Sequence, residues 1–147
     1  MPPAKFRIAL IQTSCALDPN ENLAKTEWKI REAAAGGGQI ICLQELFRSQ
    51  YFCREENHDL FALAESIPGP TTQTLGKLAR ELKIVIVASL FERRSAGLYH
   101  NTVVVLGTDG EIAGIYRSVA RQVAVKIAAQ AKDFSSKFPT ITVSKNT

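Results

Sequence analysis

The stretch Gln39–Cys53, QIICLQELFRSQYFC, restricts the fold of this chain more than any other part of the sequence. It begins with the apolar run Ile40–Leu43, which lacks the alternation of a strand with one face in water. Such a run is typical of a strand buried on both faces, in a sheet that other layers cover. Gln44 and Glu45 follow at once, and the carboxyl end of a buried strand is where α/β proteins place ligand-handling groups. The stretch therefore predicts an α/β fold with a candidate site at Glu45.

Glu45 has two interpretations. The segment after it is rich in aromatic residues, with Phe47, Tyr51 and Phe52, and these could shield the carboxylate from part of the solvent. A carboxylate shielded in this way can act as a proton acceptor near neutral pH. Alternatively, Glu45 simply ends a strand in water, because glutamates are mostly exposed.

Composition bounds the class of protein. A chain of 147 residues is long enough for one domain with a core, and 46% hydrophobic with 22% charged residues is typical of a soluble globular protein. The amino terminus lacks the layout of a cleavable signal, and no apolar run approaches the roughly 20 residues that span a bilayer. Cys15, Cys42 and Cys53 are an odd set without metal-ligand spacing. We therefore expect reduced thiols, a cytoplasmic protein and no metal site.

The basic residues are concentrated at one end. Residues 1–116 contain twelve Lys and Arg against thirteen Asp and Glu, a net charge of −1, whereas residues 117–147 contain six against one, a net charge of +5. The positive charge of the chain therefore belongs to the tail. A nucleic-acid partner for the main body has no electrostatic support.

The remaining pattern predicts the element order βαβαβββ. The first helix begins at Asp18 and Pro19 and ends at the glycines 36–38, and Trp28 beside its apolar stripe is expected to pack in the core. The second helix follows Pro68-Gly69-Pro70. Strands are expected at Phe6–Ile11, Ile40–Leu43, Ile84–Phe91, Leu98–Leu106 and Glu111–Arg117, the last two joined as a hairpin by a turn at 108–110.

From Ser118 the pattern changes. Apolar residues recur at helical spacing over 118–133, which predicts an amphipathic basic helix, followed by a Ser-, Thr- and Lys-rich end that we expect to be poorly ordered. Such a helix can bind membranes. The commoner alternative is that its apolar face packs on its own domain.

Several segments taken together resemble one known family. FRIALIQ, IICLQELF, YFC, IPGP, LAREL, IVIVASLFER, YHNTVVVLGTDG and GIYR follow one another as in the amino-terminal part of carbon–nitrogen hydrolases of the nitrilase superfamily. QELF and QYFC are most similar to the branch of N-carbamoylputrescine amidohydrolases. The resemblance covers residues 5–117, and residues 118–147 form a divergent tail. It implies the first part of an αββα sandwich, an incomplete one that the unrelated basic helix follows.

The resemblance also implies a reaction. Members of the superfamily cleave non-peptide C–N bonds through a Glu–Lys–Cys triad without a cofactor: Glu is the general base, Lys stabilises the oxyanion, and Cys forms a thioester. Glu45 matches the base. The Lys is expected directly after Tyr116-Arg117, where this chain has Ser118, and the nucleophilic Cys is expected well downstream. Two of the three catalytic groups are therefore missing from the matched positions.

Other residues are weaker candidates. Glu92 and Asn101 match segments of the family and, with Tyr51, could line a pocket, although strand-end packing or turn hydrogen bonds explain them equally well. Cys53 could replace the missing nucleophile if His58 or Glu45 activated it, but free cysteines are most often simply buried.

Three hypotheses follow for the function. The first is an incomplete hydrolase of linear amides or N-carbamoyl amines, in which truncation, an alternative exon or a shifted frame changed the chain after Arg117. The second is a non-catalytic protein that modulates a full-length relative. The third is an enzyme that takes Lys and Cys from another chain. The sequence favours the first, and uncovered apolar strands predict self-association or pairing with a related chain.

Overall fold

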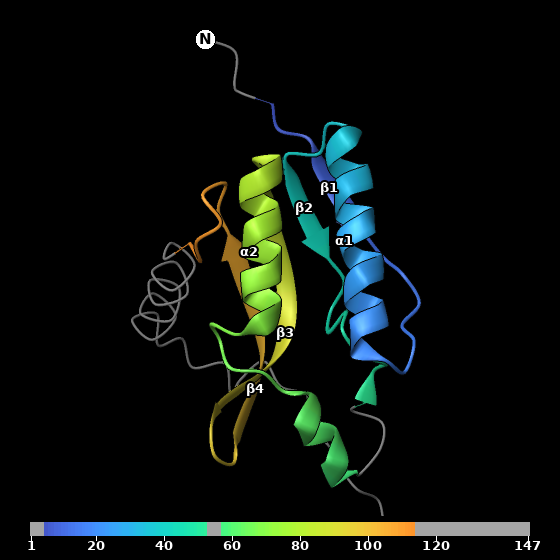
Figure 1. Cartoon of the computed structure of the whole chain (residues 1–147), viewed down its shortest axis with the longest axis vertical. Coiled ribbons are helices and arrows are strands. Elements are labelled where there is room, and N and C mark those ends of the chain that lie inside the picture. The colour runs from blue at the N-terminus through green and yellow to red at the C-terminus, as the bar shows by residue number, and fades with distance from the viewer. Residues whose placement is uncertain (1–4, 53–56, 114–147) are drawn as a thin grey trace, which may run out of the picture. The chain divides into compact units, whose positions relative to one another are not determined.

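The structure is a computed structural model that describes residues 5–52 and 57–113. Helices and strands alternate along these residues, as Figure 1 shows, and the α/β class predicted from the sequence is confirmed. The elements are β1 (Ile8–Ile11), α1 (Pro19–Ala35), β2 (Ile40–Leu43), the 3₁₀ helix η2 (His58–Leu63), α2 (Pro70–Leu82), β3 (Val85–Ser95) and β4 (Leu98–Leu106). The predicted helix over 118–133 and the tail after it lie outside the described residues.

The strands form one sheet in the order β1-β2-β3-β4. β1 pairs with β2 and β2 with β3 in parallel, whereas β3 and β4 are antiparallel. Helices make the two parallel connections, since a parallel pair needs a crossover that a tight turn cannot supply. This order brings the carboxyl ends of β2 and β3 to the same edge of the sheet.

The hairpin of this sheet differs from the expected one. β3 does not end at Phe91 but continues to Ser95, and it turns back into β4 through Gly97, whose φ of +73° suits a glycine. The charged residues 92–94 are compatible with a strand here because most of this end lies in solvent. A second hairpin was expected between β4 and a strand over 111–117. The described residues include its beginning, a bridge between Leu106 and Ile112 and a hydrogen bond of 2.8 Å from the Ala113 N–H to the Val105 carbonyl.

Local signals fix the ends of α1. The carboxylate of Asp18 accepts a hydrogen bond from the Asn20 N–H, 2.8 Å long, and Pro19 occupies the first turn, as predicted. The helix ends at Gly36. Trp28 contradicts the expectation of core packing, because 58% of it is exposed and its ring lies under Lys29 Nζ at 4.4 Å. It lies off the stripe that Ile30 and its neighbours bury.

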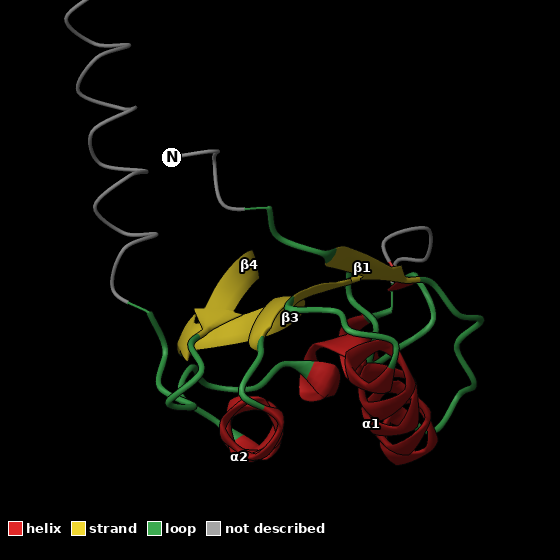
Figure 2. Cartoon of the chain, turned by 90° about the horizontal axis from the view of Figure 1, so that it is seen from above, coloured by secondary structure: helices red, strands yellow, loops and turns green. Residues whose placement is uncertain are grey.

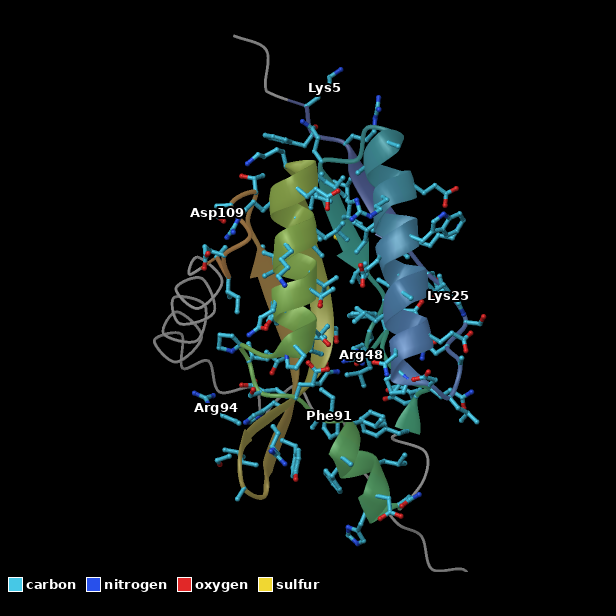
Figure 3. The ribbon with its side chains drawn as sticks, in the orientation of Figure 1. Lys5, Lys25, Arg48, Phe91, Arg94 and Asp109 are labelled. Atoms are coloured by element: carbon cyan, nitrogen blue, oxygen red, sulfur yellow. The ribbon has the colours of Figure 1, made fainter. Side chains whose placement is uncertain are left out.

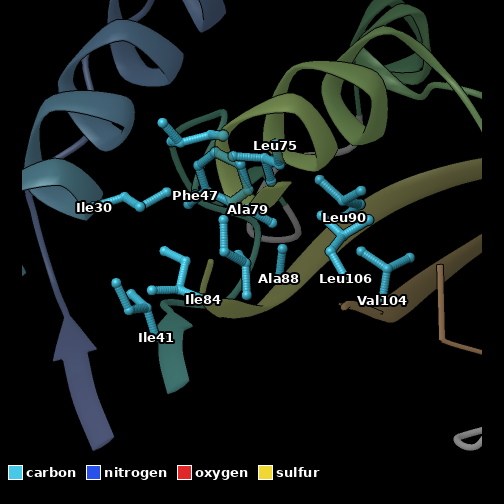
Figure 4. Packing of buried hydrophobic residues seen from close by; sticks show 12 residues of the cluster. Ile30, Ile41, Phe47, Leu75, Ala79, Ile84, Ala88, Leu90, Val104 and Leu106 are labelled. Atoms are coloured by element: carbon cyan, nitrogen blue, oxygen red, sulfur yellow. The ribbon is translucent and has the colours of Figure 1, made fainter. Parts of the chain in front are cut away.

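α1 and α2 cover one face of the sheet, as Figure 2 shows. Ile30 of α1 and Leu75 and Ala79 of α2 point at the buried side chains of the strands in Figure 4. The fully or nearly buried members of this core are Ile30, Ile41, Phe47, Leu75, Leu78, Ala79, Ile84, Ile86, Ala88, Leu90, Val104 and Leu106. Burying each large aliphatic or aromatic side chain of this kind contributes about 1.5–3 kcal/mol to folding.

The opposite face of the sheet also carries apolar side chains, but α1 and α2 do not cover it. Ile8 is 60% and Leu10 81% exposed on β1, and Val103 is exposed on β4. Residues two apart in a strand lie on the same face, so Ile8 and Leu10 share this side. Among the described residues, the sheet is therefore half of a sandwich.

Candidate functional site

Glu45 lies in a tight turn directly after β2. The next residue, Leu46, has a φ of +48° and is buried, a combination that is unusual for a bulky residue. Phe47 packs in the core below the turn, while Glu45 itself is exposed. Of the two interpretations of Glu45, shielding by the neighbouring aromatic residues is not seen in the structure, because Glu45 is exposed.

The carboxylate of Glu45 is held by a residue from β4. Asn101 Nδ2 donates a hydrogen bond of 2.5 Å to Glu45 Oε1. The other end of the amide accepts a bond of 2.8 Å from the hydroxyl of Ser89, on β3. The Ser89 oxygen in turn accepts the backbone N–H of Leu46 at 3.3 Å. These three bonds connect the turn to both strands of the hairpin.

The directions of these bonds are determined by chemistry. The Leu46 N–H can only donate, so the Ser89 oxygen accepts there and its hydrogen is free to point at the Asn101 carbonyl. The NH₂ end of the amide must then face Glu45. A donor held toward a carboxylate fixes the direction in which that carboxylate faces.

Register explains why these residues meet. Asn101 is paired with Phe91, and Ser89 lies two residues before Phe91 on the same face of β3. That face is the one that α1 and α2 do not cover, because Ala88 and Leu90 point into the core. The carboxyl end of β2 brings Glu45 to the same place.

Glu92 does not join this group. Glu92 follows Phe91 in β3, so its side chain points to the opposite face, the one that the helices cover. There its Oε2 accepts a hydrogen bond of 2.5 Å from the Thr102 hydroxyl. Tyr51 is exposed beyond the turn. The structure thus brings together Glu45 and Asn101 of the predicted set and places Glu92 apart from them.

The alternative nucleophile Cys53 lies outside the described residues. His58, its suggested base, is exposed at the start of η2 with its ring 6.2 Å from that of Phe61. The thiol of Cys15 contacts the segment around Glu45. It donates a hydrogen bond of 3.3 Å to the Phe47 carbonyl and accepts one of 3.3 Å from Gln44 Nε2. In the described part of the chain, Cys15 and Cys42 are free thiols.

A second group of polar residues lies behind the turn. Arg48 forms an ion pair with Glu65, each with 20% of its side chain exposed, and also donates to the Thr71 hydroxyl at 2.6 Å. A cavity of about 160 Å³ lies beside this pair; Arg48 and Phe91, both labelled in Figure 3, line it together with Leu46. Neither Arg48 nor Ser89 was predicted from the sequence. Ser89 is a polar residue inside the apolar run 84–91, and this was the signal in the sequence that could have revealed it.

The described residues contain no metal-binding cluster and no membrane-spanning helix. Over residues 5–52 and 57–113, no three His, Cys, Asp or Glu side chains gather in a way that could hold a metal ion. None of the helices in this part of the chain is long and apolar enough to cross a membrane.

Known proteins resemble the chain in sequence. Residues 7–138 match the family model of the carbon–nitrogen hydrolases. The chain is 38% identical over 115 residues to N-carbamoylputrescine amidase of Oryza sativa, covering 78% of this chain and 38% of that protein. It is 39% identical to citrullinase of Francisella tularensis, covering 78% of this chain and 40% of that protein. The chain therefore spans less than half the length of these curated relatives.

The fold resembles a solved structure of similar kind. A carbon–nitrogen hydrolase from Helicobacter pylori superposes with a TM-score of 0.70 at 32% identity. The match covers 74% of this chain and 38% of that one. The sheet and its two covering helices therefore have the arrangement found in a nitrilase-like protein.

Proposed function

Because the chain belongs to the carbon–nitrogen hydrolase family, we propose that it carries the general-base part of a site that hydrolyses a non-peptide C–N bond, with Glu45 as the base. The observation that supports this most is the bond from Asn101 Nδ2 to Glu45 Oε1, whose direction Ser89 determines. A general base must be held in one direction relative to the proton that it accepts, and a fixed N–H donor holds the carboxylate in this way.

The proposed step uses Oε2, the carboxylate oxygen to which Asn101 is not bound. Asn101 occupies Oε1, and Oε2 takes the proton of a thiol as the sulfur attacks the substrate carbonyl. The C–N bond then breaks, and the protonated carboxyl group gives its proton to the leaving amine. The carboxylate regenerated in this way deprotonates the water molecule that hydrolyses the thioester and releases the thiol. In the family resemblance the thiol and an oxyanion-stabilising Lys belong to positions that this chain does not match, since Ser118 stands where that Lys is expected.

We therefore propose that this chain of 147 residues does not hydrolyse substrate by itself. Nucleophile, base and oxyanion donor work as a unit, and loss of the nucleophile typically lowers kcat by several orders of magnitude.

For the substrate we propose an N-carbamoyl amine. Two relatives are named for N-carbamoylputrescine and citrulline, and these two compounds share a terminal ureido group. A cytoplasmic location is part of the proposal, since the free thiols Cys15 and Cys42 suit a reducing compartment.

A second candidate function is pairing with a full-length relative or with another copy. The observation that favours it is the exposed apolar face around Ile8 and Leu10. Pairing would modulate the relative, or would let this chain use the relative's Lys and Cys.

A fusion enzyme tests the base. Residues 5–117 of this chain are joined to the carboxyl-terminal remainder of the rice N-carbamoylputrescine amidase, and hydrolysis of N-carbamoylputrescine is measured. We expect turnover in the fusion and a fall in kcat/KM of about 10²-fold or more in its Glu45→Gln variant. The unfused chain should be inactive. Turnover by the unfused chain that disappears in Cys53→Ala would instead establish the alternative site.

A further inference from the structure

The turn that carries Glu45 holds a backbone conformation that it would not adopt alone. Leu46 has a φ of +48°, in the left-handed region, although it has a bulky side chain that is 5% exposed. Conformations of this kind persist only where the surrounding structure imposes them. Because Leu46 follows Glu45 directly, whatever imposes its conformation also determines where the Glu45 carboxylate points.

Arg48 connects this turn to the amino-terminal ends of both helices. Its guanidinium pairs with Glu65, donates to Thr71 Oγ1 at 2.6 Å in the first turn of α2, and donates to Asn20 Oδ1 at 3.3 Å in the first turn of α1. Its backbone carbonyl accepts from Asn22 Nδ2 at 3.0 Å. Arg48 is thus tied to the fold through both its side chain and its backbone.

Glu65, the partner of Arg48, is itself held rigidly. Its Oε2 accepts the Thr71 N–H at 2.9 Å, and its Oε1 accepts the Thr71 hydroxyl at 2.7 Å. Its backbone N–H donates to the Phe91 carbonyl at 3.0 Å, and its carbonyl accepts the Arg93 N–H at 2.8 Å. The ion pair therefore links the turn to β3, the strand that also supplies Ser89.

This pair differs from the bidentate Arg–Glu contact between the two helices. Arg31 and Glu81 join α1 to α2, but their side chains are 46% and 55% exposed. Exposed pairs contribute little because water screens them. Arg48 and Glu65 are 20% exposed, and charge-assisted bonds in such surroundings are stronger and more directional.

We infer that Arg48, through its ion pair with Glu65, is a positioning residue that holds the 45–49 turn so that Glu45 faces Asn101. The inference rests on the proposed role of Glu45 as a base and adds the residue that sets its direction. Arg48 does not touch the Glu45 carboxylate. It acts through the backbone of the turn, at Leu46 and Phe47.

Nuclear magnetic resonance on the whole 147-residue chain tests the inference without measuring hydrolysis. The variants are Arg48→Met and, as a matched control, Arg31→Met, which removes the exposed pair. The readouts are hydrogen exchange of the Leu46 amide and the side-chain NH₂ resonances of Asn101. In Arg48→Met we expect Leu46 exchange to accelerate about tenfold or more and the Asn101 resonances to move toward those of Glu45→Gln, while core amides of Ile30 and Leu78 stay protected.

The control should leave both readouts as in the natural chain. Equal behaviour of Arg48→Met and Arg31→Met, or a uniform loss of protection that includes Ile30 and Leu78, would overturn the inference. If Arg48→Met does not fold, Arg48→Lys decides: one ammonium cannot serve Glu65 and Asn20 in the same geometry, so Leu46 exchange should rise, and an unchanged rate overturns the inference. Since neither readout depends on turnover, an active Glu45→Gln fusion would refute the base assignment without altering this result.

Discussion

The side-chain amide of Asn101 donates a 2.5 Å hydrogen bond to the carboxylate of Glu45, although 56 residues separate them in the chain. Ser89 holds the other end of the same amide, so the donor cannot turn away without breaking a second bond. A carboxylate at a strand end in water would have no such partner of fixed direction. The contact is the observation on which the proposed role of Glu45 as a general base rests.

The first prediction concerns this contact. Asn101→Asp places a second carboxylate against Glu45, and like charges at this distance repel. At pH 7 and low salt we expect the free energy of unfolding to fall by about 1–2 kcal/mol, with part of the loss recovered in about 1 M NaCl, because salt screens exposed charges. Urea unfolding at both salt concentrations measures the effect.

Asn101→Ala is its control. That variant loses the same hydrogen bond without adding a charge, so its stability loss should not depend on salt. An equal salt response in the two variants would mean that Asn101 does not face the Glu45 carboxylate in solution.

The second prediction concerns the contact between α2 and the turn after β4. A Cβ on Gly76 would lie 2.5 Å from the Gly110 carbonyl oxygen, and backbone cannot move aside easily. Alanine favours a helix over glycine by about 1 kcal/mol, but the overpacking costs about 1–3 kcal/mol. Gly76→Ala should therefore lower the thermal midpoint, while Gln73→Ala, at an exposed position of the same helix, should not. A stabilised Gly76→Ala would show that this turn is not packed on α2.

The third prediction is a pH dependence. The hydrogen bond from Arg31 lowers the pKa of Glu81 below its ordinary value of 4.5. A depressed carboxyl pKa stabilises the fold above the unfolded value, and this contribution is lost as the pH falls through the folded value. The natural chain should therefore be slightly more stable than Glu81→Gln at pH 7. The difference should shrink as the pH falls below the ordinary value of 4.5, and it should vanish below the lowered pKa of the folded state. Paired thermal melts measure it, and a difference that grows on acidification would contradict the assignment.

The fourth prediction concerns the uncovered face of the sheet. Exposed Ile8 and Leu10 should promote self-association, which light scattering and binding of a hydrophobic dye detect. Leu10→Lys should reduce both signals. Trp28→Lys removes another exposed apolar residue, from the outer side of α1, and should leave them unchanged. A natural chain that is a monodisperse monomer without dye binding would contradict the proposed pairing surface.

Much of the secondary structure was predictable because its causes are local. Asp18 and Pro19 begin α1 through contacts within one turn, and the apolar run Ile40–Leu43 is a strand wherever it is placed in a layered fold. The carboxyl end of β3 was not predicted, because a run of charged residues normally marks the end of a strand. Here the strand passes beyond the helices that cover it, so Glu92, Arg93 and Ser95 pair with β4 while this end of the strand remains largely in solvent.

The sequence by itself determined the α/β class, the cap of α1 and the place of Glu45 shortly after an apolar strand, since each depends on neighbours a few positions away. Only the tertiary structure decided which residues surround Glu45. The antiparallel register of β3 and β4 puts Asn101 and Ser89 on one face and Glu92 on the other, and the packing of α1 and α2 brings Glu65 to Arg48. Periodicity cannot reveal these contacts, because hydrogen bonds between distant segments depend on how the layers stack.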